Sequence, residues 1–336
     1  MRVLEEFLRP TQAELFKMIR KMYKGMVYVC EQNFLLVRGK APIMLVAHLD
    51  TVHSEPVKEI CKSKDKNILM SPQGIGGDDR CGVYALVKIH ELAQVKPWLL
   101  FTCDEEAGGV GAENFCKAYA KGKLPAELSA LKFVVEVDRR GSNDAVYYDC
   151  DSHDFETYIT DKGFVTACGS FSDISLIAPA LGVAAVNLSS GYYNAHTPHE
   201  YIVRSELECT IEKIIGMVAD AAKIDFPKYA YAKRKCEVID KRYASYFYDR
   251  QKIYGFGKNA LPVCLTSENR LHDEFCDTGT RKRLPSEYEE IYDELLEMYS
   301  AEELEKFREL YGDQILYEIY IDEYGPFFAE QDREVI

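Results

Sequence analysis

Residues 42–50 read PIMLVAHLD, an apolar run that becomes polar only at its end. A continuous apolar run of this length is typical of a strand buried on both faces, as in the sheets of α/β proteins. In such sheets the functional groups gather beyond the carboxyl ends of the strands. The run therefore predicts an α/β fold, with His48 and Asp50 at the edge of the sheet where a site is expected.

Strands and helices alternate on both sides of this run, and residues 57–63 and 66–71 form a predicted hairpin. The other predicted strands are 26–30, 34–39, 98–103, 131–137, 144–150 and 183–189. The predicted helices are 12–22, 81–93, 111–122, 153–163, 173–182 and 205–223. This order predicts three layers, in which a mixed and mostly parallel sheet lies between helices.

Capping signals precede three of these helices. Thr11 with Glu14, and Ser205 with Glu208, have the spacing of a capping box, in which each side chain bonds the other residue's backbone N–H. Ser152 stands directly before the helix at 153–163 and is expected to cap it. These signals fix where the helices should begin.

The composition changes near Asp225, and three regions are predicted: a catalytic domain (1–225), a basic tyrosine-rich connector (226–284) and an acidic helical tail (285–336). The last region holds 17 acidic and 3 basic residues, which account for the net charge of −14. Its apolar positions recur at helical spacing, so the fold is expected to carry a helical C-terminal extension. Docking of this tail on a second copy would give a homo-oligomer.

The composition also indicates in which cellular compartment the protein functions. The longest apolar runs are shorter than the roughly 18 residues of a membrane span, and the N-terminal residues do not resemble a signal peptide. The 11 cysteines show no CxxC pair and no regular spacing, which favours reduced thiols over a disulfide framework. We therefore expect a cytoplasmic protein with no membrane contact.

Potential metal ligands follow several predicted strands. Besides His48 and Asp50, they are Glu105 and Glu106 after the strand at 98–103, Asp138 after 131–137, Asp78 and Asp79 in the glycine-rich turn GIGGDD, and His196 and His199 in the loop before the last helix. Each is a weak signal alone, because a solvated carboxylate or a loop histidine is common. A mixed shell of carboxylate and imidazole suits zinc foremost, or manganese and cobalt. So many donors exceed one tetrahedral site and suit two divalent metal ions that share a carboxylate.

The motifs together are more specific than any of them alone. VAHLDTV, GIGGDDRCG, FTCDEEAGGVG, EVD and NAHTPHEY resemble, in order, the five metal-site motifs of the co-catalytic zinc exopeptidases, the superfamily that includes peptidase T and the bacterial leucine aminopeptidases. The resemblance covers roughly residues 25–225. It departs from peptidase T in one respect: Asp138 and His196 are only 58 positions apart, which leaves no room for the inserted lid domain of that enzyme.

The resemblance implies a role for each residue. The metal ligands would be His48, Asp78, Glu106, Asp138 and His196. Of these, Asp78 would bridge both ions, His48 and Asp138 would complete one site, and Glu106 and His196 the other. Asp50 would orient His48, Glu105 would be the general base, and the Asp78–Asp79 peptide would be cis.

A metal-dependent exopeptidase, either an aminopeptidase or a di/tripeptidase acting on short peptides, is the function that these residues favour. An N-acyl amino acid deacylase would need the same two-metal site, and a non-enzymatic binding protein could keep the same fold. Arg139 and Arg140 are candidates for binding a substrate carboxylate, although surface arginines are an equally good interpretation, and Asp173 is a candidate because it falls where the edge of the sheet is expected. Nucleic-acid binding by the basic stretch 228–258 is the remaining alternative, which a role as a solvated connector outweighs.

Overall fold

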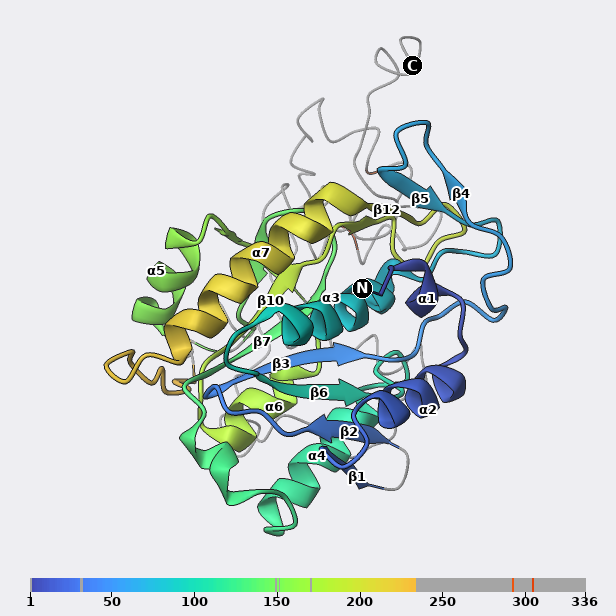
Figure 1. The fold of residues 1–336 in the computed structure, drawn as a ribbon. Helices are drawn as coiled ribbons and strands as arrows, with labels where there is room; N and C mark the ends of the chain where they lie inside the picture. The colour runs from blue at the N-terminus through green and yellow to red at the C-terminus, as the bar shows by residue number, and fades with distance from the viewer. Residues whose placement is uncertain are drawn as a thin grey trace, which may run out of the picture. The chain divides into compact units, whose positions relative to one another are not determined.

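An eight-stranded sheet forms the centre of the body, as the computed structural model shows (Figure 1). The structure describes residues 2–30, 33–148, 150, 152–169 and 171–233, together with Tyr292 and Leu304. In spatial order the strands are β1 (Val27–Cys30), β2 (Phe34–Val37), β6 (Trp98–Thr102), β3 (Ile43–His48), β7 (Phe133–Arg139), β10 (Ala185–Ser189), β8 (Asp144–Val146) and β9 (Val165–Thr166). The four central strands β6, β3, β7 and β10 are parallel, whereas β1, β2 and β8 join them in antiparallel pairs. The predicted mixed, mostly parallel sheet is confirmed.

Helices cover both faces of this sheet. One core contains side chains of α1 (Glu5–Leu8), α2 (Gln12–Met22), α3 (Gly77–Leu92), α5 (His153–Asp161) and α7 (Arg204–Ala221). The other contains side chains of α4 (Val110–Ala120), the 3-10 helix η1 (Ala126–Ala130) and α6 (Ile174–Leu181). In Figure 1, α3 and α7 cross the sheet on the side nearest the viewer. The predicted three-layer arrangement is therefore confirmed.

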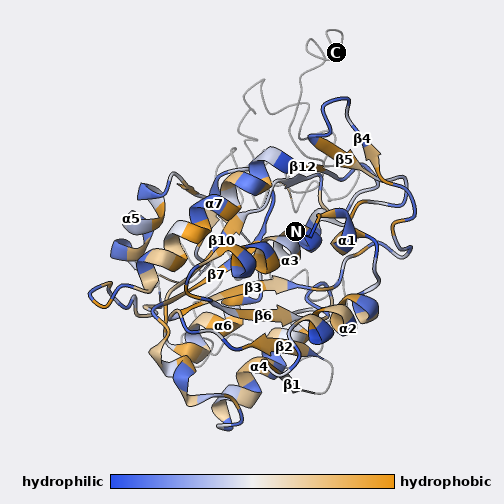
Figure 2. Ribbon diagram, viewed as in Figure 1, coloured by the Kyte–Doolittle hydropathy of each residue, from blue (hydrophilic) through white to orange (hydrophobic). Residues whose placement is uncertain are grey.

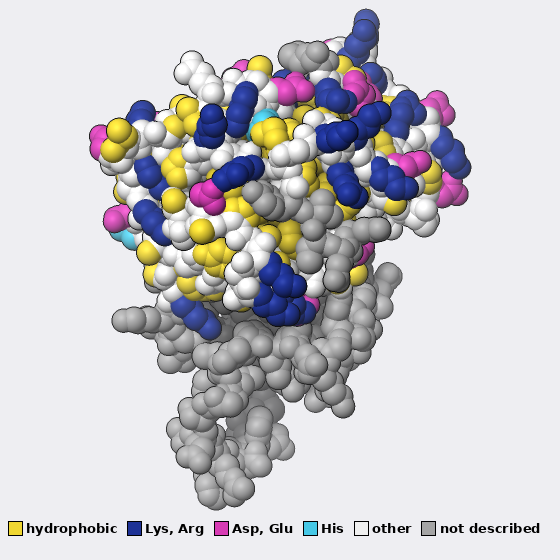
Figure 3. Space-filling model, turned by 60° about the horizontal axis from the view of Figure 1, so that its bottom comes forward, with side chains coloured by type: hydrophobic (Ala, Val, Ile, Leu, Met, Phe, Trp, Pro, Cys, Tyr) yellow, Lys and Arg dark blue, Asp and Glu magenta, His cyan; other side chains and the backbone are white. Residues whose placement is uncertain are grey.

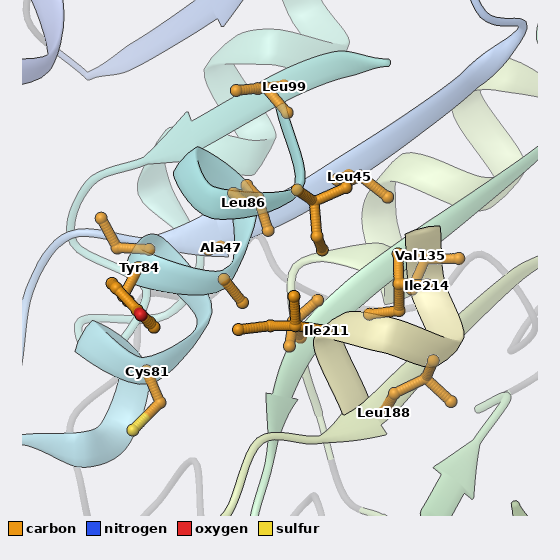
Figure 4. Close-up of a cluster of buried hydrophobic side chains, with 14 of the residues drawn as sticks. Leu45, Ala47, Cys81, Tyr84, Leu86, Leu99, Val135, Leu188, Ile211 and Ile214 are labelled. Carbon is orange, nitrogen blue, oxygen red and sulfur yellow. The ribbon is translucent and has the colours of Figure 1, made fainter. Parts of the chain in front are cut away.

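The strand β3 shows why the apolar run predicted the fold. Every residue from Ile43 to His48 is buried, because helices lie over both faces of the sheet. Leu45 and Ala47 pack with Leu86 of α3 and Ile211 of α7, as Figure 4 shows. Met44 and Val46 point to the other face of the sheet and belong to the second core. The hydropathy colours of Figure 2 show the central strands as hydrophobic along most of their length.

A second, smaller sheet holds part of the predicted site. Its order is β11 (Tyr192–Tyr193), β12 (Tyr201–Val203), β5 (Ile68–Met70) and β4 (Cys61–Lys62), and all its pairs are antiparallel. The pair β4 and β5 is the predicted hairpin. The pair β11 and β12 was not predicted, because two or three residues give no readable period. The loop that joins β11 to β12 carries His196.

The capping predictions have mixed outcomes. The box at α2 is present, since the Glu14 backbone N–H donates to the Thr11 hydroxyl and the Thr11 N–H donates to the Glu14 carboxylate. Ser152 is the N-cap of α5, but its side chain makes no capping bond. The box predicted at Ser205 is wrong: α7 begins one residue earlier, and the Ser205 N–H donates to the Asn67 side chain instead.

The compact unit extends beyond the predicted boundary at Asp225. It runs from Met1 to Lys235, and a second unit comprises Cys236–Ile336. Phe226 and Tyr229 lie in a cluster of aromatic rings around Phe133, and the Tyr229 carbonyl accepts from the Ala184 N–H. Most of the predicted connector and nearly all of the predicted acidic tail lie outside the described residues. The connector and the helical tail therefore remain predictions.

Two observations concern the surface of the described residues. None of their helices has both the length and the apolar character that a membrane crossing requires. On the face drawn in Figure 3, Lys and Arg side chains are dispersed among neutral and hydrophobic ones. The basic stretch 228–258, to which nucleic-acid binding was ascribed, lies mostly outside the described residues, so that alternative remains a prediction.

Candidate metal centre

The five predicted metal ligands lie together. His48, Asp78 and Asp138 offer donor atoms that all lie within 4.8 Å of one another, and so do Asp78, Glu106 and His196. The two sets share Asp78. One carboxylate oxygen of Asp78 is 3.1 Å from His48 Nε2, and the other is 3.2 Å from His196 Nε2. This is the arrangement expected of a carboxylate that bridges two metal positions.

The sheet brings these side chains together. His48 is the last residue of β3, Asp138 is near the end of β7, and Glu105 and Glu106 follow β6. These strands are adjacent and parallel, so their carboxyl ends meet at one edge. Asp78 reaches that edge from the first turn of α3, where its φ/ψ angles are not helical.

The glycine-rich turn before α3 is held by close contacts. The Asp78–Asp79 peptide is cis, as the motif resemblance implied. The Asp79 carboxylate is buried and accepts from the backbone N–H groups of His48 and Gly82. A side chain at Gly82 would lie 2.3 Å from the Val137 carbonyl oxygen, so only glycine lets α3 approach β7 this closely. Asp79 thus joins the turn to β3 and does not belong to either donor set.

Asp50 connects two parts of the site. One of its carboxylate oxygens lies 3.2 Å from His48 Nδ1, so Nε2 of the same ring is the nitrogen that faces the donor sets. The two oxygens also accept from the backbone N–H groups of Glu105 and Glu106, at 3.1 and 3.0 Å. Such a carboxylate fixes the orientation of the imidazole and raises its basicity as a ligand.

Glu200 is a site residue that the sequence did not reveal. Its carboxylate is buried and accepts from the backbone N–H groups of Gly76 and Asp78, at 3.0 and 2.9 Å. His53 Nε2 lies 2.7 Å from the same carboxylate. A Cβ at Gly77 would meet a Glu200 oxygen at 3.1 Å, so glycine there leaves room for this clamp. Glu200 follows His196 by four residues, and that spacing was the signal available.

Asn187 and Tyr192 hold Asp138 in a similar way, and neither was predicted. The Asn187 amide accepts from the Asp138 N–H at 2.9 Å and donates to the Asp138 carbonyl at 2.8 Å. It does so where the pairing of β10 with β7 shifts register. The Tyr192 hydroxyl donates to the Asp138 carboxylate at 3.2 Å. The backbone and the side chain of this ligand are therefore both fixed.

Negative charge dominates the electrostatics of the site. Burial raises the pKa of Asp138 to about 8, and the nearby Asp78 charge acts in the same direction. Burial also raises the pKa of Glu105 well above its ordinary value. Hydrogen bonds that the His196 ring donates to the Asp78 and Glu106 carboxylates raise the pKa of His196 to about 11. Burial disfavours a charged His48, but the Asp138, Asp50 and Asp78 carboxylates together outweigh it and raise the pKa of His48 well above its ordinary value. Carboxylates thus outnumber the cations that neutralise them.

The donor geometry fits divalent metal ions. Ligands about 2.0 Å from a tetrahedral ion stand about 3.3 Å apart. The donor separations His48 to Asp138, His48 to Asp78 and His196 to Glu106 are 3.6, 3.1 and 3.1 Å. Carboxylate oxygen with imidazole nitrogen is the donor set of zinc, manganese and cobalt. The residues therefore suit two such ions, which would also balance the excess of carboxylates.

The fold and the sequence identify the class of protein. The structure of the aminopeptidase PepT from Bacillus cereus has a TM-score of 0.50 and 15% identity, covering 66% of this chain and 98% of that one. A tripeptidase from Staphylococcus aureus has a TM-score of 0.50 and 14% identity, covering 65% and 96%. No curated protein sequence matches significantly. Residues 36–169 match the model of peptidase family M28.

The body thus resembles an M28 peptidase over residues 36–169. Its fold is that of the co-catalytic zinc exopeptidases, as the five motifs predicted, and its class is that of a metal-dependent peptide hydrolase. The matched residues 36–169 include every predicted ligand except His196. That histidine is joined to the rest of the peptidase site by its distances to Asp78 and Glu106.

The three residues predicted to contact substrate differ in their exposure to solvent. Asp173 is wholly buried, and its carboxylate accepts from the Thr102 hydroxyl, so the structure leaves it no surface that a substrate could touch. Arg139 is partly exposed at the end of β7, where its guanidinium donates to Asp144. Arg140 is partly exposed beside it, and its carbonyl accepts from the Ser189 hydroxyl. The two arginines remain candidates, but Asp173 does not.

Proposed function

We propose that the body is a two-metal aminopeptidase that acts on short peptides, with zinc as the metal. The observation that carries this proposal is the pair of donor sets that meet at Asp78, with Glu105 beside them. One Glu105 oxygen is 4.0 Å from His48 Nε2, yet Glu105 belongs to neither of the two sets that share Asp78. Glu105 also forms a third group of donors with His48 and Glu106, but the two sets that share Asp78 would hold two ions without it.

The roles of the residues follow from this geometry. Ions held by the two sets would supply Lewis acidity, which lowers the pKa of a bound water towards neutrality and polarises the scissile carbonyl. Glu105 accepts the proton of the attacking water and returns it to the leaving amine. Asp50 keeps the His48 ring oriented and holds the backbone of Glu105 and Glu106. The Glu105 side chain is only 11% exposed, so its proton is partly shielded from bulk water.

Substitution of Glu105 tests the proposal. Glu105→Gln keeps the shape of the side chain and all five proposed ligands, so both metals should remain bound while turnover falls by about 100-fold or more, the low end for a general base. Glu113→Gln on the exposed face of α4 is the matched control and should retain parental turnover. Metal content and turnover are measured on the same samples. Near-parental turnover of Glu105→Gln would remove this residue from its role.

A substrate panel tests the activity itself. Peptides of two to six residues with free amino termini are compared with the same peptides acetylated at the amino terminus and with acetylated single amino acids. An aminopeptidase should release the first residue only from the free peptides. Release of acetate from acetylated amino acids, with intact free peptides, would replace the proposal with the deacylase alternative. Zinc, manganese and cobalt are added in turn to the metal-free protein to identify the ion that restores activity.

A further inference from the structure

The segment that carries Glu105 and Glu106 has an unusual backbone. Asp104, which precedes them, adopts a φ of 58°, in the left-handed region that side-chain-bearing residues rarely occupy. This conformation turns the chain after β6 so that the next two N–H groups both reach Asp50. The turn is therefore what presents Glu105 and Glu106 to the site. A residue in this conformation needs partners that hold it there.

Gln12 is one such partner, and it comes from the other end of the sequence. Its side-chain Nε2 donates to the Asp104 carboxylate at 2.8 Å, and its Oε1 accepts from the Asp104 backbone N–H at 3.1 Å. One amide thus satisfies both the backbone and the side chain of the residue. The pair is partly buried, so water competes less for these groups than it would at an open surface.

The position of Gln12 is itself fixed. It is the first residue of α2, directly after the Thr11 cap. The chain before it is tied to α3, because the Arg80 guanidinium donates to the carbonyls of Phe7 and Pro10, at 3.2 and 2.7 Å. Arg80 is buried and follows Asp79 directly, so the same turn that presents Asp78 also anchors the amino-terminal segment.

We propose that Gln12 is a positioning residue for the proposed base Glu105 and the proposed ligand Glu106. The inference rests on the function proposed above. In this arrangement Gln12, at the start of α2, fixes the turn from which both glutamates project. Without Gln12, the Asp104 N–H loses its partner and the left-handed conformation loses its support. Small displacements of reacting groups can cost about 100-fold in rate.

Three variants test the role of Gln12. Gln12→Ala should lower kcat by about 10-fold or more, with bound metal and KM close to parental values. Glu14→Ala is the matched control, because it removes the Glu14 carboxylate from the capping box of the same helix but leaves the Thr11 cap and the Gln12 contacts in place, and it should keep the parental kcat. In the double variant Gln12→Ala with Asp104→Gly, kcat should rise above that of Gln12→Ala alone, because glycine adopts a positive φ without strain. A purely structural role of Gln12 predicts no such recovery.

The outcomes are separable. A parental kcat for Gln12→Ala, or an equal loss for Glu14→Ala, would overturn the role of Gln12. If Gln12→Ala does not fold, Gln12→Asn replaces it, since the shorter amide cannot span both contacts and should show the same loss. The proposed function fails independently, when the parental protein releases no residue from the free peptides of the substrate panel. An inactive Glu105→Gln beside a fully active Gln12→Ala would leave the proposed base intact and remove only this inference.

Discussion

Replacement of Glu200 by glutamine is the sharpest test of how the bridging carboxylate is held. The Glu200 carboxylate accepts from two backbone N–H groups of the turn before α3 and is 1% exposed. A glutamine has the same size but only one acceptor oxygen, and its NH₂ group would face a backbone N–H. One of the two groups, on Gly76 or Asp78, would therefore lose its acceptor inside the protein.

The expected loss of stability is the lost hydrogen bond, reduced by a smaller opposing effect. A hydrogen bond to a charged group contributes about 1.5–3 kcal/mol. A buried N–H left without a partner costs about 1–3 kcal/mol, and the two figures describe the same loss, so they are not added. Burial raises the pKa of Glu200, which means that its charged form is disfavoured and that a neutral amide returns part of the loss. We expect a net loss of about 2 kcal/mol in the free energy of unfolding. For a unit of this size that corresponds to about 4–8 °C in Tm.

The assay is thermal unfolding of the metal-free protein, followed by circular dichroism, together with a zinc titration. Glu206→Gln is the matched control: Glu206 also accepts a side-chain hydrogen bond, from the Tyr193 hydroxyl, but lies at the surface end of α7 and contacts no residue of the donor sets. It should change Tm by less than about 2 °C. Zinc should bind more weakly to Glu200→Gln and normally to Glu206→Gln. Equal Tm values and equal affinities for the two variants would refute the reasoning.

Two further outcomes are expected. His196→Ala should lose one metal ion on dialysis whereas His199→Ala keeps both, as metal analysis of the two proteins would show; the reverse order would identify His199 as the ligand. Burial lowers the pKa of His90 to about 4, so between about pH 6.5 and 4 the unfolded chain binds a proton that the folded chain does not, and this residue reduces stability as the pH falls, by at most about 3 kcal/mol. His90→Phe should therefore narrow the difference between the urea midpoints of unfolding at pH 7 and pH 4.5. An unchanged difference would show that His90 does not cause the loss of stability at low pH.

The central strands and the ligands were predictable because their signals are local. The run that ends in His48 is apolar throughout, since helices cover both faces of β3, and that pattern has few alternatives. Glu105, Glu106 and Asp138 could be placed because residues at the ends of adjacent parallel strands meet at one edge. The motif order supplied His196, which comes from a small sheet that has no readable period in the sequence.

The residues that hold the ligands could not be predicted, because their partners are distant in the sequence. Glu200 bonds a residue 122 positions away, Gln12 bonds one 92 positions away, and Asn187 bonds one 49 positions away. An isolated glutamate, glutamine or asparagine has no local pattern that marks such a contact. The cap predicted at Ser205 failed for the same reason, since the distant Asn67 takes its N–H.

The two histidines of the donor sets differ greatly in exposure: the side chain of His48 is 1% exposed and that of His196 is 54% exposed. His48 belongs to the sheet, whereas His196 lies on a loop between two short strands. Exchange of an ion held by His196 requires only a movement of that loop, but exchange at His48 requires the strand edge to open. Brief chelation should therefore empty the two positions in sequence, the exposed one first. A protein refilled at that stage would hold two different metals, so the contribution of each position to turnover could be measured separately.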